Sequence, residues 1–131
     1  VIKQGGGGKI VNTSSQAAVR ALPGLGLYCA AKAAVLQYTK VLALELAPHK
    51  INVNAVLPGT IMTDQLVEVF TRMAQSLGMP TDDLTKLLPP IPWGRIQTQD
   101  DVASCALWLA SSESDYVTGE GILVTGGQTL A

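Results

Sequence analysis

The feature that most constrains this chain is a long helical segment that stands between two short apolar runs. Residues 9–12 (KIVN) and 51–57 (INVNAVL) have the β-branched, largely apolar character of buried strands. Residues 27–47 contain neither glycine nor proline and predict one helix that ends at Pro48. A strand, a helix and a second strand in this order predict parallel strands joined by a helical crossover. Further along the chain we expect two helices and a last strand, over residues 63–77, 98–110 and 121–124. The sequence therefore predicts an α/β fold, with a parallel sheet flanked by helices.

Composition agrees with one folded domain and excludes several kinds of partner. Of the 131 residues, 47% are hydrophobic and 15% are charged, which is enough apolar material for a core. The net charge is −1, so nothing favours binding to nucleic acid or to an anionic membrane. The apolar runs are far shorter than the roughly 20 residues of a membrane span. We therefore expect no nucleic-acid partner and no membrane partner.

The two cysteines indicate a reducing environment. Cys29 and Cys105 lie far apart in helix-like sequence, and no CxxC motif is present. The one histidine, His49, cannot complete a zinc site of the Cys/His kind. We expect two reduced thiols in a cytoplasmic protein with no metal site, and a disulfide is the minor alternative.

Side chains at the carboxyl ends of parallel strands are the first candidates for chemistry, because ligands of open α/β sheets bind there. Tyr28 and Lys32 lie four residues apart, so they share one helix face just after the first strand. A free tyrosine titrates near pH 10, and a nearby ammonium favours the phenolate, so the pair could act as a general acid/base. Ser15, at the end of the preceding strand, could donate a hydrogen bond to a substrate oxygen. The spacing alone favours a tyrosine packed beside a surface lysine, because pairs four residues apart on a helix are common.

Five ordered segments together resemble the short-chain dehydrogenase/reductase family, nearly from end to end of the chain. They are NTSS (12–15), YCAAK (28–32), NVNAVLPGTIMT (52–63), VTG (117–119) and the closing glycine pair (126–127). The resemblance implies a Rossmann-like fold and an oxidoreductase that uses NAD or NADP. Such an enzyme interconverts an alcohol and a ketone or aldehyde by hydride transfer.

The resemblance also implies roles for individual residues. Tyr28 matches the acid/base, Lys32 the residue that binds the nicotinamide ribose and favours the phenolate, and Ser15 the residue that orients the substrate. The substrate-binding set is Ser15, Gln16 and Tyr28. The cofactor-binding set is Tyr28, Lys32, Pro58, Gly59, Ile61 and Thr63. Residues 62–92 match the variable substrate loop, and its apolar content suggests a partly apolar substrate.

The family's N-terminal elements have no counterpart in residues 1–131. Its Gly-rich phosphate turn follows a strand and opens a helix, whereas the run from Gly5 to Gly8 precedes a strand. We therefore expect this chain to be only the C-terminal half of the doubly wound fold, without the part that binds the cofactor phosphates. The alternative function is an inactive fragment, or a binding or assembly module.

Two further expectations concern association and a rival chemistry. The helix over 27–47 is apolar nearly all round, so we expect one side to face the sheet and the other a second subunit, in a homodimer or homotetramer. A serine hydrolase would need His49 beside Ser15. His49 precedes the strand 51–57 and Ser15 follows the strand 9–12, so the two should lie about 20 Å apart.

Overall fold

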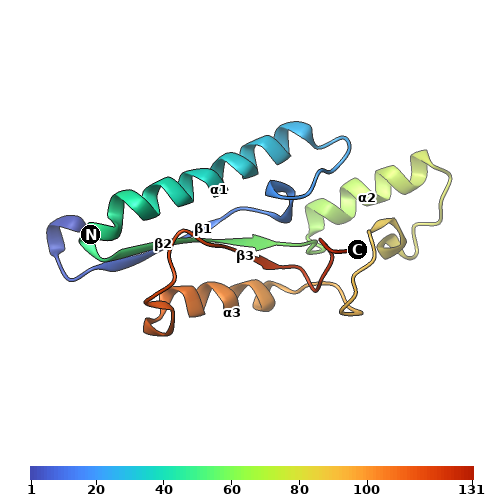
Figure 1. The fold of residues 1–131 in the computed structure, drawn as a ribbon. Coiled ribbons are helices and arrows are strands. Elements are labelled where there is room, and N and C mark those ends of the chain that lie inside the picture. The colour runs from blue at the N-terminus through green and yellow to red at the C-terminus, as the bar shows by residue number, and fades with distance from the viewer.

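A computed structural model describes residues 1–131 and contains a parallel sheet of three strands (Figure 1). The strands are β1 (Gly8–Thr13), β2 (Ile51–Pro58) and β3 (Gly121–Val124). β2 lies in the middle and pairs in parallel with both neighbours. Parallel neighbours need crossover connections, and helices supply them here. The α/β prediction is confirmed.

The helices are α1 (Gly26–Leu46), α2 (Asp64–Ser76) and α3 (Gln99–Ala110). Short 3-10 turns complete the chain at Ile2–Gln4, Gln16–Ala18, Ala47–His49, Leu84–Leu87 and Ser112–Ser114. The predicted helix over 27–47 differs at its end, because α1 stops at Leu46 and continues as a 3-10 turn. Pro48 lies in the first positions of that turn, where a missing N–H costs little. Lys50 then takes a left-handed conformation (φ 58°) and directs the chain into β2.

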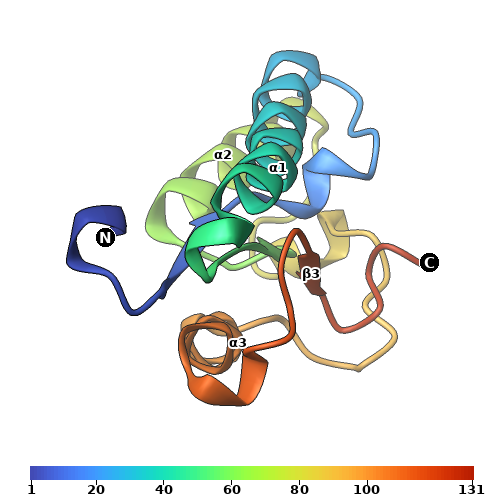
Figure 2. The same ribbon diagram turned by 60° about the vertical axis from the view of Figure 1, so that its left-hand side comes forward.

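The molecule has three layers, with α1 on one face of the sheet and α3 on the other (Figures 1 and 2). Successive residues of a strand point to opposite faces. Ile51 and Val53 pack with Ala43 of α1 in a buried cluster, bordered by Ile10, Leu42 and Leu46. Val53 is completely buried. This apolar contact holds the crossover helix against the sheet.

The two asparagines that interrupt the apolar run of β2 bind the loop that leads into β3. Asn54 is 1% exposed. Its Nδ2 donates to the Val117 carbonyl oxygen (2.8 Å), and its Oδ1 accepts from the Glu120 N–H (3.0 Å). Asn52 Nδ2 donates to the carbonyl oxygens of Asp115 (2.9 Å) and Val117 (3.0 Å). Both amides therefore replace backbone partners that the loop lacks.

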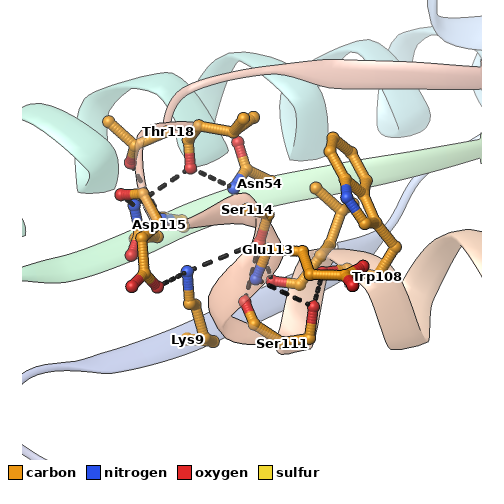
Figure 3. Close-up of polar contacts among 12 residues, drawn as sticks. Lys9, Asn54, Trp108, Ser111, Glu113, Ser114, Asp115 and Thr118 are labelled. Carbon is orange, nitrogen blue, oxygen red and sulfur yellow. Dashed lines mark hydrogen bonds and ion pairs between the residues drawn. The ribbon is translucent and has the colours of Figure 1, made fainter.

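Lys9 of β1 joins the same network from the neighbouring strand (Figure 3). Its Nζ lies 2.8 Å from Asp115 Oδ1 and donates to Ser114 Oγ (3.4 Å). Ser114 is completely buried and donates to the Leu109 carbonyl oxygen (2.9 Å) at the end of α3. We call Lys9, Asn52, Asn54, Ser114 and Asp115 the amino-end cluster, because they surround the amino end of β3.

The outer surfaces leave apolar groups exposed. On α1, the side away from the sheet carries Leu27, Tyr38, Val41 and Leu44, exposed by 92%, 61%, 40% and 80%. β1 pairs with β2 alone, so its other edge has no partner strand. One side of α1 thus faces the sheet, as predicted, and the other is open in this chain. None of the helices combines the length and apolar character that crossing a membrane requires.

Candidate active site

Segments that follow all three strands meet at the carboxyl edge of the sheet. Ser14 and Ser15 follow β1, Gly59 and Thr60 follow β2, and residues 125–128 follow β3. The helix α2 lies beyond this edge (Figure 1). The edge is where ligands of open α/β sheets bind, so the structure brings the candidate segments together where the sequence places them.

The two neighbouring serines use their hydroxyls differently. Ser14 Oγ donates to the carbonyl oxygen of Lys32 (2.8 Å), so its proton ties β1 to α1. Ser15 Oγ accepts from the Ala17 N–H (3.1 Å) and caps the turn Gln16–Ala18. A hydroxyl that only accepts still has its proton to donate. Of the two, Ser15 is therefore the one whose hydroxyl can donate to a ligand oxygen.

Tyr28 and Lys32 lie on one face in the first turns of α1. The Lys32 ammonium sits 5.8 Å from the centroid of the Tyr28 ring, within cation–π range. It also donates to the carbonyl oxygen of Thr13 (3.3 Å), the last residue of β1. An ammonium has three protons, so two remain for a ligand. Through Thr13, the helix face with Tyr28 is attached to the strand end that carries Ser15.

The segment after β2 approaches β3 so closely that a side chain at position 59 would require its neighbours to move by a few tenths of an ångström. The Gly59 N–H donates to the Val124 carbonyl oxygen (2.9 Å). A Cβ at this position would lie 3.1 Å from Gln128 Oε1 and 3.2 Å from Thr125 Cα. Such contacts are tighter than normal packing allows. Pro58, the last residue of β2, and Gly59 are thus held rigidly at the edge.

The remaining predicted cofactor contacts lie just beyond. Ile61 forms an isolated parallel bridge with Gln97, at the end of the substrate-loop region. Thr63 caps α2, and its Oγ1 accepts from the Leu66 N–H (3.3 Å). As with Ser15, its hydroxyl proton stays available to a ligand oxygen.

A group of three polar residues, two of them buried, joins these segments. Gln128 Oε1 accepts from Gln16 Nε2 (3.0 Å), from the Thr60 N–H (3.2 Å) and from Thr60 Oγ1 (3.1 Å). Gln128 is 1% exposed and Gln16 is 7% exposed. Two of the amide atoms, Gln16 Oε1 and Gln128 Nε2, are buried without a hydrogen-bond partner. We call Gln16, Thr60 and Gln128 the carboxyl-end cluster.

Sequence reasoning selected Gln16 for this site and missed Thr60 and Gln128. Gln16 and Gln128 are 112 residues apart in the chain. No local pattern links them, and only the parallel order of the strands brings them to one edge. The glycines before Gln128 were the one available signal, because they mark a turn at the end of β3.

The residues present fit the nicotinamide end of a dinucleotide. Lys32 has two unused protons, Thr63 has one, and Gly59 lets the backbone approach closely. The glycine run 5–8 leads into the amino end of β1, at the opposite end of the strand from the site, and Gly7 is closed in by the Lys50 carbonyl oxygen. That run does not form a phosphate turn here.

The structure also places the residues of the rival chemistry. His49 lies in the turn before β2, and Ser15 follows β1, whose first residue Gly8 pairs with Ile51. The two side chains are therefore at opposite ends of the sheet. Cys29 and Cys105 are both free thiols, as expected. The chain brings together no group of three His, Cys, Asp or Glu residues suited to a metal ion.

The substrate loop predicted over 62–92 contains α2 and the turn Leu84–Leu87. The segment at the end of this loop packs onto the turn after β3, where the Trp93 N–H donates to the Gly126 carbonyl oxygen (3.0 Å). A Cβ on Gly127 would lie 3.2 Å from Pro92 Cγ. The loop is thus attached to the same turn that carries Gln128.

Comparisons with known proteins agree with this geometry. A family model described as enoyl-(acyl carrier protein) reductase matches residues 1–129. An NAD-dependent glycerol dehydrogenase of Listeria innocua is 43% identical over 95% of this chain, and a diacetyl reductase [(S)-acetoin forming] of Staphylococcus aureus is 40% identical over 92%. A solved actinorhodin polyketide ketoreductase with NADPH superposes with a TM-score of 0.87 at 30% identity, over 96% of this chain.

The matches cover only part of each relative. The aligned region is 46% of the glycerol dehydrogenase, 47% of the diacetyl reductase and 49% of the ketoreductase. The chain thus spans about half the length of the curated relatives it matches. The match to the family model over nearly all residues, together with the Rossmann-like sheet, shows that this chain belongs to the short-chain dehydrogenase/reductase family.

Proposed function

We propose that the protein containing this chain is an NAD(P)-dependent oxidoreductase that interconverts an alcohol and a ketone or aldehyde. The observation that carries the proposal is the attachment of Lys32, beside Tyr28, to the end of the strand that leads into Ser15. This contact links the helix face of Tyr28 and Lys32 to the strand end that precedes Ser15, which supports a shared role of the three groups in proton transfer. Residues 1–131 form the C-terminal part of that enzyme.

In the reducing direction, Ser15 donates its free hydroxyl proton to the carbonyl oxygen of the substrate and so fixes its position. Tyr28 gives its phenolic proton to the same oxygen as the carbon is reduced. In the oxidising direction, the Tyr28 phenolate accepts the alcohol proton instead. The nicotinamide, when bound, supplies or accepts the hydride.

In this proposal Lys32 has two roles, one toward Tyr28 and one toward the cofactor. Its ammonium, next to the Tyr28 ring, stabilises negative charge on the phenolic oxygen. Its two unused protons bind the ribose hydroxyls of the cofactor. The Thr13 carbonyl holds the lysine in this place, so a change of backbone at the end of β1 would disturb proton transfer and cofactor binding together.

Pro58, Gly59, Ile61 and Thr63 form the wall against the nicotinamide in this proposal. The Thr63 hydroxyl donates to an oxygen of the cofactor. Both NAD and NADP remain candidates: the printed name of the Listeria relative specifies NAD, and the ketoreductase structure contains NADPH. The names of the relatives favour small hydroxy and carbonyl compounds as substrates.

Association and location complete the proposal. The exposed apolar side of α1 is suited to a second copy of the protein, in a homodimer or homotetramer. Two free cysteines fit a reducing compartment, and we place the protein in the cytoplasm.

The test is Tyr28→Phe in the intact protein, meaning the chain with whatever sequence precedes Val1. Phenylalanine keeps the ring against Lys32 and removes the proton, so kcat should fall by at least about 1,000-fold while NADH or NADPH binding persists. Tyr38→Phe is the matched control, because Tyr38 lies on the exposed side of the same helix. Full turnover by Tyr28→Phe would refute the mechanism.

The alternative is an inactive fragment or an assembly module, favoured by the exposed apolar side of α1 and the partial coverage of the relatives. The two functions differ in one observable. An assembly module associates but gives no NADH oxidation with any carbonyl compound, whereas the enzyme gives turnover that depends on Tyr28.

A further inference from the structure

Gln128 uses one atom to hold two sides of the candidate site. Its Oε1 accepts hydrogen bonds from Gln16 Nε2 and from both the N–H and the hydroxyl of Thr60. Gln16 directly follows Ser15, on the substrate side. Thr60 lies between Gly59 and Ile61, on the side that we propose for the nicotinamide. The side chain of Gln128 therefore connects the substrate side of the candidate site to the side that we propose for the nicotinamide.

The backbone of Gln128 is fixed, so the side chain has little freedom to leave this place. Its N–H donates to the Thr125 carbonyl oxygen (3.1 Å). Its carbonyl oxygen accepts from Arg20 Nη1, and Arg20 Nη2 donates to the Ala131 carbonyl oxygen (3.3 Å). Gly127, just before it, has φ 82°, a conformation that glycine adopts without strain.

These bonds determine which end of the Gln16 amide is free. Nε2 of Gln16 donates to Gln128 Oε1 (3.0 Å) and to Thr60 Oγ1 (3.5 Å), so Oε1 is left, and that atom is buried and unpartnered. Gln128 in turn leaves Nε2 as a buried donor without a partner. A buried polar atom without a partner costs free energy unless a ligand satisfies it. The cluster thus offers one acceptor and one donor.

A hydroxyl group satisfies such a combination, because it donates one hydrogen bond and accepts others. A carbonyl group only accepts, so it would leave Gln16 Oε1 unpaired. A ligand that contacts both atoms is therefore matched better by a hydroxyl than by a second carbonyl beside the reacting carbon.

We propose that Gln128 is a positioning residue that orients the Gln16 amide and thereby favours substrates with a hydroxyl group next to the reacting carbonyl, such as α-hydroxyketones. The inference rests on the proposed function, and it adds the substrate class and a residue from outside the matched motifs. Gln128 acts through Gln16 and Thr60 and takes no part in proton transfer.

The experiment compares acetoin with diacetyl, which share a carbon skeleton and differ at one group, in the intact protein. Gln128→Met keeps the length of the side chain and removes the acceptor; Gln128→Glu keeps an acceptor oxygen. We expect Gln128→Met to lower the acetoin-to-diacetyl ratio of kcat/KM about tenfold, mainly through KM for acetoin. Gln128→Glu keeps the acceptor for Gln16 and Thr60 but loses the Nε2 donor, so it should restore only part of the ratio. An unchanged ratio in Gln128→Met would overturn the proposal.

A readout without substrate separates this inference from the proposed function. Amide-proton exchange at Thr60, followed by NMR, should accelerate in Gln128→Met and stay slow in Gln128→Glu. If Gln128→Met does not fold, Gln128→Asn withdraws the same oxygen by one methylene and gives the same comparisons. Slow Thr60 exchange in the variant that lacks the acceptor would overturn the positioning role.

The outcomes for the two claims differ. An active wild-type enzyme that prefers diacetyl to acetoin contradicts the hydroxyl preference and leaves the oxidoreductase proposal intact. A wild-type protein that reduces no carbonyl compound contradicts the oxidoreductase proposal itself.

In a double-mutant cycle, Gln16→Met and Gln128→Met should have non-additive effects on KM, since they remove the same hydrogen bond. Additive effects would contradict the proposed path through Gln16.

Discussion

The two polar clusters at opposite ends of the sheet are built from similar side chains but differ in how completely they are paired. In the amino-end cluster, the buried Asn54 uses both ends of its amide within the chain, and the buried Ser114 hydroxyl donates as well. In the carboxyl-end cluster, Gln16 and Gln128 are also buried, yet each retains one atom without a partner.

Burial of a polar atom costs free energy unless a hydrogen bond replaces its contact with water. A fully paired cluster therefore stabilises one fold and offers nothing to a ligand. An incompletely paired cluster gives up stability and keeps binding capacity. The comparison predicts that substitutions at the amino end change the free energy of unfolding, whereas those at the carboxyl end change kinetics.

After Tyr28→Phe, the largest kinetic effect is expected for Ser15→Ala. Its hydroxyl proton is unused within the fold, so its removal takes away a donor to the substrate oxygen and should lower kcat about 100- to 1,000-fold. The Ala17 N–H loses its cap, which costs about 1 kcal/mol of unfolding free energy. Steady-state kinetics and urea unfolding on the intact protein measure the two effects.

Ser14→Ala is the matched control for Ser15. The Ser14 hydroxyl proton is already engaged with the Lys32 carbonyl oxygen, so the change should lower stability by about 1 kcal/mol. Its effect on kcat should stay below about tenfold. Equal losses of kcat in the two variants would mean that the free proton of Ser15 has no special role.

In the amino-end cluster, Asn54→Ala should lower the free energy of unfolding and leave kcat nearly unchanged. The change leaves the Glu120 N–H without its side-chain acceptor and removes one of the two donors to the Val117 carbonyl oxygen, which should lower the free energy of unfolding by about 1–3 kcal/mol. kcat per folded molecule should change less than about threefold. Asn52→Ala, at a more exposed position, should cost less, and a larger loss there would contradict the role of burial.

The sequence predicted this architecture well because the elements carry local signals. The apolar run 51–57, the long helix 27–47 and the cap at Thr98 each appear in the structure within one or two residues of the expected bounds. Parallel order follows from the alternation of strand and helix, and it places Ser15, Tyr28 and Gly59 near one edge.

The pairing of distant polar groups could not be predicted in the same way. Asn52 and Asn54 looked like interruptions of an apolar strand, and only the fold shows that they bind the loop 115–120. For Gln128 the preceding glycine pair indicated only a turn, because its hydrogen-bond partners are set by sheet register and by the path of that turn. Local patterns thus locate the elements, whereas the hydrogen-bond partners depend on tertiary contacts.

The smallest expected effect concerns Asp101, a carboxylate near the carboxyl edge that is fully paired. Arg95 donates to it with two nitrogens, each 2.7 Å from a carboxylate oxygen, and the Thr98 N–H donates over 2.8 Å. The Arg95 guanidinium, followed by the hydrogen bonds from Thr98, holds the pKa of Asp101 well below its ordinary value of 3.8. A carboxylate with a lowered pKa stabilises the fold above its unfolded pKa, and this contribution disappears as the pH falls through the folded value.

The unfolding free energy of the intact protein should therefore decline below about pH 5, and this decline should be shallower in Asp101→Asn, which has no carboxylate to protonate. Urea unfolding at pH 7, 5 and 3 measures the difference, and exposure of the pair to solvent keeps it small. kcat at pH 7 should hardly change. If Asp101→Asn lowered kcat as strongly as Ser15→Ala, an unused donor or acceptor would not be what makes a polar group important for catalysis. Its position at the sheet edge would then decide.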